Sequence, residues 1–144
     1  MSTAAFHFNV DNRLHYTCRL VRKAVAAGNR LVVTGPGDTL AQLDRDLWAL
    51  SATEFLPHCH GSDPSPLAHR SPVLLCESLD GVAVRDVLIN LAESVPVGAE
   101  GFERVIEVVT SDPVERSQAR LRWKHYAHVG MPLIQHDLSH KAPA

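Results

Sequence analysis

The spacing of hydrophobic residues along the chain alternates between a strand pattern and a helix pattern. Short apolar runs rich in β-branched residues predict buried strands. These runs lie at residues 6–10, 30–34, 71–76, 87–91 and 104–109. Apolar residues recur every three or four positions over residues 13–27 and 38–50, which predicts two helices. Strands that alternate with helices indicate one α/β layered domain with a mostly parallel sheet.

A third helix is expected within residues 111–130, where the sequence carries signals for both helix ends. Asp112 is a favourable N-cap, Pro113 suits the first helical position, and Glu115 can complete a box-like cap. Gly130 suits the position just beyond the C-terminus. This helix therefore has the best-defined boundaries in the chain.

The third helix combines cations with an aromatic side chain on one face. At about 100° per residue, Arg116, Arg120, Trp123 and Lys124 fall on one side together with Ala127. Such a face could grip an acidic, partly aromatic peptide. The alternative is a solvated basic face with the tryptophan packed in the core, and the helix alone favours this alternative.

We expect the α/β domain to span residues 1–131 and residues 132–144 to form a C-terminal tail that is partly flexible. The tail opens with a proline and ends in Lys-Ala-Pro-Ala, next to the chain terminus. Chain termini of this kind usually fray, so no further element is predicted there.

The composition is that of an ordinary globular chain and excludes a general polyanion binder. Of the 144 residues, 45% are hydrophobic and 21% are charged, and the formal net charge is −2. A protein that coats DNA needs a basic excess, so direct contact with nucleic acid would depend on a local patch such as the third helix. No apolar run reaches the roughly 18 residues of a membrane span.

Cysteine usage and the N-terminal residues predict a cytoplasmic protein. The three cysteines lie far apart, and Cys18 and Cys76 fall within apolar segments, as small buried hydrophobic residues do. Unpaired cysteines are typical of a reducing compartment. The first ten residues also lack the basic and apolar regions of a secretory signal.

The turn Gly35-Pro36-Gly37 joins a strand to a helix, as phosphate-binding loops do. A P-loop requires Gly-Lys-Ser/Thr, whereas Asp38 follows Gly37 and puts a carboxylate where a phosphate would bind. The dinucleotide motif is also incomplete, because Leu40 takes the position of its last glycine. A small nucleotide-binding enzyme is therefore the alternative function, and an ordinary turn is the preferred interpretation.

The residues His58, Cys59, His60 and His69 are zinc-ligand types that lie close together in the sequence. Adjacent residues in His-Cys-His cannot readily bind one ion together, and no ordered second pair follows them. We therefore expect no metal and no cofactor.

The sequence contains no recognisable nucleophilic centre, so we expect no catalytic residue and no enzyme. The Gly-x-Ser-x-Gly pattern is absent, and no cysteine is paired with a histidine in a reactive setting. The carboxylates of Asp44, Asp46, Glu103 and Glu107 are expected on solvated faces of helices and strands.

Two large aromatic residues, Trp48 and Phe55, lie around the end of the second helix. They could pack in the core or anchor a contact with another protein, and the residues alone favour the core.

Three segments taken together resemble the chi subunit family of bacterial DNA polymerase III holoenzyme. They are Leu47-Trp48-Ala49 with Phe55 and Pro57-His58, then residues 87–91, and then residues 102–109 continuing to Arg120, Trp123-Lys124, Tyr126 and Gly130. The resemblance covers most of the chain, from the first strand to Gly130. It implies a Rossmann-like fold, with a sheet flanked by helices and without a functional nucleotide site.

This resemblance implies a replisome adaptor without catalytic activity, since the polymerase activity belongs to the complex and not to this chain. Members of the family bind the acidic C-terminal tail of single-stranded-DNA-binding protein, which ends in phenylalanine. They also pair with a psi subunit, which links them to the clamp-loader complex. Such a protein meets DNA only indirectly and works in the bacterial cytoplasm, at the replication fork.

The resemblance also implies two sites on this chain. The positions that match the tail-binding residues of the family are Val109, Arg116, Arg120, Trp123 and Lys124. Trp123 replaces a tyrosine that is common in the family, and Ala127 occupies a position that is basic in relatives. The psi-facing surface maps onto Trp48 and Phe55.

The chemistry of these residue types suits an acidic tail. The Arg120 guanidinium can bind a terminal carboxylate with two parallel hydrogen bonds, which lysine cannot match. Trp123 and Val109 can wall a pocket for a terminal phenylalanine. Arg116 and Lys124 can steer the acidic residues, an effect that salt weakens.

Overall fold

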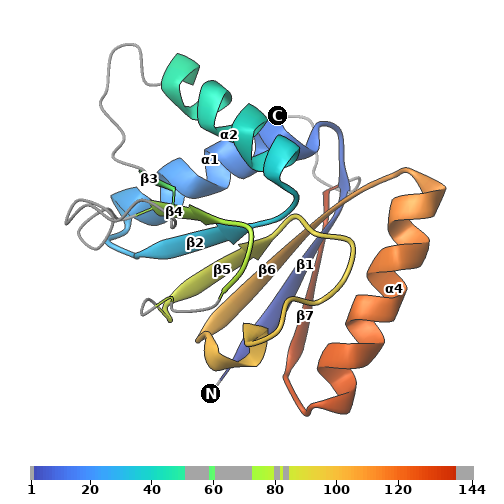
Figure 1. Ribbon diagram of the computed structural model, residues 1–144. Coiled ribbons are helices and arrows are strands. Elements are labelled where there is room, and N and C mark those ends of the chain that lie inside the picture. The colour runs from blue at the N-terminus through green and yellow to red at the C-terminus, as the bar shows by residue number, and fades with distance from the viewer. Residues whose placement is uncertain (1, 51–58, 61–72, 80–81, 83–84, 139–144) are drawn as a thin grey trace.

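Parallel strands form one continuous sheet in the computed structural model, with helices on both of its faces (Figure 1). The structure describes residues 2–50, 59–60, 73–79, 82 and 85–138. Within these residues the sheet has seven strands in the order β3-β4-β2-β5-β6-β1-β7, and every pairing between neighbours is parallel. The predicted α/β, Rossmann-like architecture with a mostly parallel sheet is confirmed.

The strands and helices agree closely with the apolar pattern of the sequence. The strands are β1 (Thr3–Val10), β2 (Leu31–Thr34), β3 (Cys59–His60), β4 (Val73–Cys76), β5 (Val87–Asn90), β6 (Arg104–Thr110) and β7 (Leu133–Asp137). The helices are α1 (Arg13–Ala26), α2 (Gly37–Leu50) and α4 (Pro113–His128), with a short 3₁₀ turn η1 at Ala99–Gly101. All five predicted strands and all three predicted helices are present, with ends shifted by a few residues.

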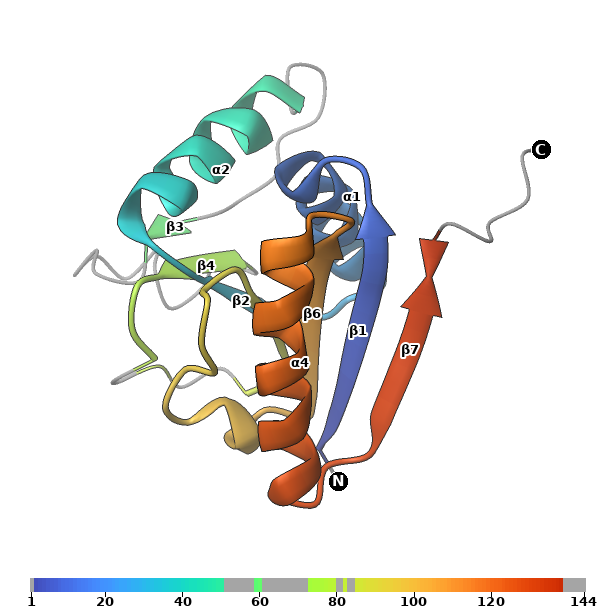
Figure 2. The same cartoon turned by 90° about the vertical axis from the view of Figure 1, so that its right-hand side faces the viewer.

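The helices divide between the two faces of the sheet. Figure 1 shows α1 and α2 side by side over one face, and Figure 2 shows α4 along the other face, in front of β6 and β1. In parallel sheets both faces are normally covered, and the strands accordingly read as nearly continuous apolar runs. Three of the central strands, β2, β4 and β5, are buried along their whole length.

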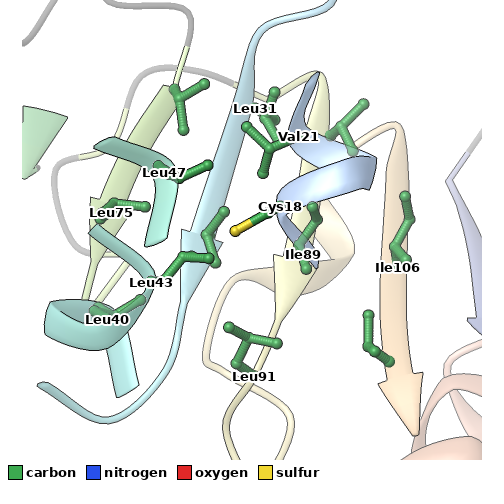
Figure 3. Packing of buried hydrophobic residues seen from close by; sticks show 14 of the residues in the cluster. Cys18, Val21, Leu31, Leu40, Leu43, Leu47, Leu75, Ile89, Leu91 and Ile106 are labelled. Atoms are coloured by element: carbon green, nitrogen blue, oxygen red, sulfur yellow. The ribbon is translucent and has the colours of Figure 1, made fainter. Parts of the chain in front are cut away.

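The core beneath α1 and α2 is apolar throughout the cluster shown in Figure 3. Residues of α2 at helical spacing, Leu40, Leu43 and Leu47, meet Cys18 and Val21 of α1 over the sheet. Cys18 and Cys76 are buried, as the sequence predicts. Burial raises the pKa of the Cys18 thiol to about 11, and the nearby Asp46 acts in the same direction.

Helix α4 begins and ends where the sequence predicts. The Asp112 side chain accepts a hydrogen bond from the Glu115 backbone N–H at 3.0 Å, and Pro113 opens the helix. Gly130, at a φ of +82°, follows the C-terminus in the left-handed region that glycine tolerates. The Glu115 carboxylate does not complete the box, since it accepts a hydrogen bond from the Thr110 hydroxyl at 2.8 Å.

Strand β7 lies within the segment that the sequence assigns to a flexible tail. Residues Leu133–Asp137 pair in parallel with β1, so this part of the segment belongs to the sheet. The strand contains only two apolar residues, and most of its side chains are exposed because it lies at the sheet edge. The usual signal of a buried strand is therefore missing. Residues 139–144 lie outside the described part of the chain, and the proposed domain limits stay a prediction.

An irregularity near the end of β1 changes which face of the sheet its side chains reach. Between His7 and Val10 the strand advances three residues while β6 advances two, from Val108 to Thr110. Asn9 has a φ of +60°, a conformation that asparagine adopts more easily than most residues. Ahead of the irregularity, Phe6 packs toward α4, whereas Val10 packs toward α1 and α2. Near this irregularity, the Asn9 side chain reaches the neighbouring strand β7, where its amide bonds to Asp137.

No helix among the described residues is long and apolar enough to cross a membrane.

Candidate functional site

A groove of about 330 Å³ runs between α4, the edge strand β7 and its neighbour β1. Its lining side chains come from three separate parts of the sequence. They are Phe8 and Asn9 of β1, Arg116, Ala119, Arg120 and Trp123 of α4, and Gln135 and Asp137 of β7. The groove therefore has a helix wall that is basic and aromatic and a strand wall that is polar.

The helix wall brings together three of the five predicted tail-binding residues. Arg116, Arg120 and Trp123 lie on successive turns along one flank of α4, and all three line the groove. Both arginines are exposed, and within the described part of the chain neither has a side-chain hydrogen bond or an ion pair. Their guanidinium donors are therefore available to an anionic ligand.

The aromatic side of the groove is held by stacked rings. The Trp123 ring lies 5.1 Å from the ring of Phe6 and is tilted by 59°, and Phe6 stacks on Phe8 at 5.8 Å. Tyr126 meets Phe6 edge-on, with the ring centroids 5.9 Å apart. Trp123 is half-buried, so part of its ring packs against the core and part faces the groove. Both interpretations of this tryptophan drawn from the sequence thus describe part of its environment.

The other two predicted tail-binding residues do not line the groove. Val109 is fully buried in the apolar core beneath α4. Lys124 is exposed, and it lies on α4 beyond the lining residues, as does Ala127. Any role of Val109 in binding would act through the packing beneath the groove, and any role of Lys124 through long-range attraction.

The strand wall was not predicted from the sequence. Gln135 and Asp137 reach the groove because alternate residues of β7 point to one face, and they pair with Phe6 and Phe8 of β1. The Asn9 amide donates a hydrogen bond of 2.7 Å to the Asp137 carboxylate. A polar strand at a chain end gives no periodic apolar signal, so this wall could not be read from the pattern.

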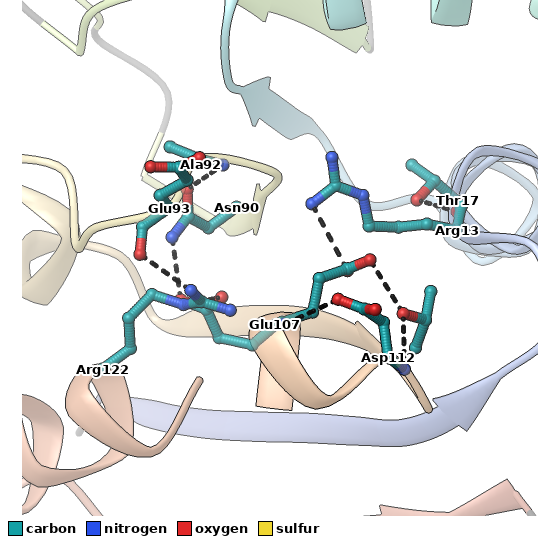
Figure 4. A network of polar contacts seen from close by, with 10 residues as sticks. Arg13, Thr17, Asn90, Ala92, Glu93, Glu107, Asp112 and Arg122 are labelled. Atoms are coloured by element: carbon teal, nitrogen blue, oxygen red, sulfur yellow. Dashed lines mark hydrogen bonds and ion pairs between the residues drawn. The ribbon is translucent and has the colours of Figure 1, made fainter. Parts of the chain in front are cut away.

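Directly beneath α4 lies a buried charge pair, and this corrects the prediction that Glu107 is solvated. Glu107 is 0% exposed, and its Oε1 accepts a hydrogen bond of 2.8 Å from Arg122 Nε (Figure 4). Its Oε2 accepts from the Tyr126 hydroxyl at 2.7 Å and from Asn90 Nδ2 at 2.9 Å. Arg122 also donates from Nη1 to the Glu93 carbonyl at 2.8 Å, which ties α4 to the loop after β5.

The electrostatics of this cluster follow from burial. Burial raises the pKa of the Glu107 carboxyl, and the Arg122 guanidinium with the hydrogen bonds from Asn90 and Tyr126 opposes that rise. Burial and the adjacent Glu107 both raise the pKa of Tyr126. The cluster is enclosed and carries no groove-lining residue, so we interpret it as the anchor of α4 and not as a reactive centre.

One signal in the sequence could have found this cluster. Within β6, Val105, Glu107 and Val109 share a face, so Glu107 stands between two core residues. On α4, Arg122 lies between Ala119 and Tyr126 on the buried stripe. A charged residue of each sign at the centre of an apolar face indicates a buried pair.

The geometry of the turn at Gly35-Pro36-Gly37 opposes a phosphate site. A Cβ atom at Gly37 would clash with the Glu77 carboxylate, so this acidic group lies directly against the start of α2. Asp38 is the next residue of the helix. Two carboxylates at the N-terminus of α2 repel a phosphate, which disfavours the nucleotide-binding alternative.

The remaining candidate residues fall largely outside the described part of the chain. Cys59 and His60 form β3, whereas His58 and His69 lie outside the described residues. Among the described residues, no group of three or more histidine, cysteine or acidic side chains is arranged to hold a metal ion. Trp48 belongs to the last turn of α2, and Phe55 lies outside the described residues.

Fold and site together define a class of protein: an α/β domain in which α4, β1 and β7 form an open groove with a basic and aromatic helix wall and a polar strand wall. The chain belongs to the DNA polymerase III chi subunit family, because the family model described as "DNA polymerase III chi subunit, HolC" matches residues 1–134.

Similarity to individual proteins agrees with the family assignment. The chain is 32% identical over 127 residues to the DNA polymerase III subunit chi of Pseudomonas aeruginosa. The matched region covers 88% of this chain and 87% of that protein. It is 28% identical over 130 residues to the subunit of the same name from Haemophilus influenzae, with 85% and 88% covered. The corresponding Escherichia coli subunit is 26% identical over 117 residues, with 81% and 79% covered.

Proposed function

We propose that this chain is a non-catalytic replisome adaptor that binds the acidic C-terminal tail of single-stranded-DNA-binding protein. Through a psi subunit it links that protein to the clamp-loader complex of DNA polymerase III in the cytoplasm. The observation that carries the proposal is that Arg116, Arg120 and Trp123, three positions implied by the family resemblance, line one groove.

The first step of binding pairs the carboxylates of the tail with the helix wall. Arg120 holds the terminal carboxylate with two parallel hydrogen bonds, and Arg116, one turn earlier, meets an acidic residue upstream. Within the described residues neither arginine has an ion pair, so binding breaks none there. Lys124 adds a longer-range attraction that speeds association and weakens with salt.

The second step buries the terminal phenylalanine of the tail. Trp123 and Phe8 offer ring surface within the groove, and Phe6 supports both rings from below. Aromatic contacts of this kind add to the free energy of burying apolar area. Because Val109 packs in the core under α4, it supports the groove without touching the ligand.

Calorimetric titration with an acidic peptide ending in Asp-Ile-Pro-Phe tests the proposal. We expect binding that weakens as salt is raised and is lost when the last phenylalanine is removed. Arg120→Ala should weaken binding by about 1.5–3 kcal/mol, as for a hydrogen bond to a charged group. Arg19→Ala, which removes the same charge from an exposed position on α1, should leave affinity nearly unchanged. A wild-type protein that ignores the peptide at low salt would disprove tail binding.

The proposed contact with psi has its own test. We place it at Trp48 in the last turn of α2 and at Phe55 beyond that helix. Co-expression with the psi subunit of the same organism should give a complex that Trp48→Ala disrupts. Arg45→Ala, one turn earlier on the same helix, should leave the complex intact. If Trp48→Ala co-purifies with psi as the wild type does, the psi surface lies elsewhere.

A further inference from the structure

Among the described residues that line the groove, Asp137 is the acidic one, and it lies opposite the basic wall. Among the lining residues, Arg116 and Arg120 supply positive charge from α4, and Asp137 supplies negative charge from β7. An acid is unexpected in a groove that receives an acidic ligand, because like charges repel. Its presence therefore calls for a functional explanation.

The position of Asp137 is fixed by the fold on two sides. In the parallel pairing of β1 with β7, Asp137 is the partner of Phe8. Side chains of a strand point alternately to the two faces of the sheet, and the side chain of Asp137 points to the face covered by α4. The Asn9 amide then holds its carboxylate at 2.7 Å. Asn9 reaches it from the irregular end of β1, where its φ is +60°. The carboxylate is therefore held at the groove wall by neighbouring groups.

We propose that Asp137 is a specificity-determining residue that excludes anionic groups from the strand wall of the groove. This inference rests on the proposed binding of an acidic tail. With Asp137 in position, a peptide is accepted only when its carboxylates lie along α4 and its strand-facing groups are neutral. The groove then selects the arrangement of acidic residues in the ligand and not merely its net charge.

The expected energetic effect is modest because the groove is open to water. Repulsion between exposed unit charges is strongly attenuated by water and salt, so removal of the Asp137 charge should tighten binding by roughly two- to tenfold. Asp137→Asn retains an oxygen that can accept the hydrogen bond from Asn9. The variant therefore removes the charge and preserves the contact.

Titrations of two peptides against the wild type and Asp137→Asn test the proposal. The first peptide is the acidic peptide ending in Asp-Ile-Pro-Phe, and the second carries aspartate in place of its isoleucine. We expect the wild type to bind the second peptide less tightly than the first. Asp137→Asn should bind both peptides more tightly, with the larger gain for the second, and the gain should shrink at high salt.

Two further variants separate a local effect from a change in net charge or folding. Glu100→Gln removes one negative charge from an exposed position on η1, outside the groove, and should not change affinity. Gln135→Glu adds an acid to the same strand wall and should weaken binding several-fold. Circular dichroism on each variant confirms that it is folded.

The outcomes distinguish this inference from the proposed function. If the wild type binds the first peptide but Asp137→Asn binds both peptides with unchanged affinity, the specificity role is overturned and tail binding stands. The same conclusion follows if Glu100→Gln gives the same gain as Asp137→Asn. If neither the wild type nor Asp137→Asn binds the first peptide, both proposals fail.

Discussion

The two faces of the sheet are packed by different means. On the face covered by α1 and α2, the buried polar side chain of the described helix residues is the Thr17 hydroxyl, which donates to the Arg13 carbonyl within α1, whereas the core beneath α4 contains the charged Glu107–Arg122 pair. Apolar packing is non-directional, so it fixes the position of a helix mainly through side-chain shape. Hydrogen bonds to both oxygens of a buried carboxylate also depend on direction. The face that carries the groove is therefore the face on which helix rotation is specified by polar groups.

The largest expected effect comes from breaking the pair on one side only. Arg122→Ala leaves the Glu107 carboxylate buried without its cation, which should cost about 3–5 kcal/mol of unfolding free energy. Urea unfolding of the variant and the wild type measures this loss of unfolding free energy. The exposed neighbour Arg120, by contrast, should lose less than about 0.5 kcal/mol on substitution by alanine.

Removing both charges tests whether the directional hydrogen bonds of the buried pair are needed to orient α4. The double variant Glu107→Leu with Arg122→Met should regain most of the lost stability, because apolar residues of similar size can replace a buried pair. We expect it to bind the acidic peptide less tightly than the wild type, since α4 has lost its directional bonds to the sheet. Full peptide affinity in the double variant would show that the polar core is not needed to orient the groove.

On the opposite face, Leu43→Ala should act on stability alone. Leu43 is fully buried between α2 and the sheet, and its truncation leaves a cavity that should cost about 2–5 kcal/mol. Below the unfolding transition, the affinity for the peptide should equal that of the wild type. A matching loss of affinity would mean that the two faces are coupled and that the contrast between them is too simple.

The cap of α4 gives a smaller effect on the groove-bearing face. Asp112→Ala removes the acceptor for the Glu115 backbone N–H and should cost about 1 kcal/mol in chemical unfolding. Ser111→Ala, next to the cap, should change little. A loss as large as that of Arg122→Ala would indicate that the helix end, and not the buried pair, holds α4 on the sheet.

The smallest expected effect on stability at neutral pH concerns His7, which lies on the α1 side of β1. Burial, followed by His136 and Lys23, lowers the pKa of His7 from 6.5 to about 4. The unfolded chain then takes up the proton first, so stability should fall as the pH is lowered from about 6.5 toward 4. His7→Gln should flatten this part of the stability curve, and His15→Gln, at an exposed position, should not. An unchanged slope in His7→Gln would show that His7 is not held neutral.

The sequence predicts most of this fold because its elements carry local signals. The Asp112 cap, the Gly130 stop and the leucine stripe of α2 are all readable within a few residues, and the structure confirms them. The alternation of Val105, Glu107 and Val109 signals that Glu107 is buried, but it does not say which side chains bind its carboxylate. Its partners lie 15 to 19 positions away in the chain, and only the packing of α4 on β5 and β6 brings them together.

The candidate site divides in the same way. Arg116, Arg120 and Trp123 share a helix face, so their spacing alone groups them on one wall. Asp137 and Gln135 join them only through the pairing of β7 with β1. Because an exposed edge strand needs few apolar residues, its sequence resembles that of a loop. The strand wall of the groove therefore cannot be predicted before the pairing of the strands is known.

The groove is assembled from residues 8–9, 116–123 and 135–137, which are far apart in the sequence. Ribosomes synthesise β1 before α4, and β7 after both. A nascent chain that stops before residue 133 therefore has the helix wall but lacks the strand wall that faces it. Under the proposed function, the complete groove, and with it the selection by Asp137, therefore forms only after β7 has paired with β1.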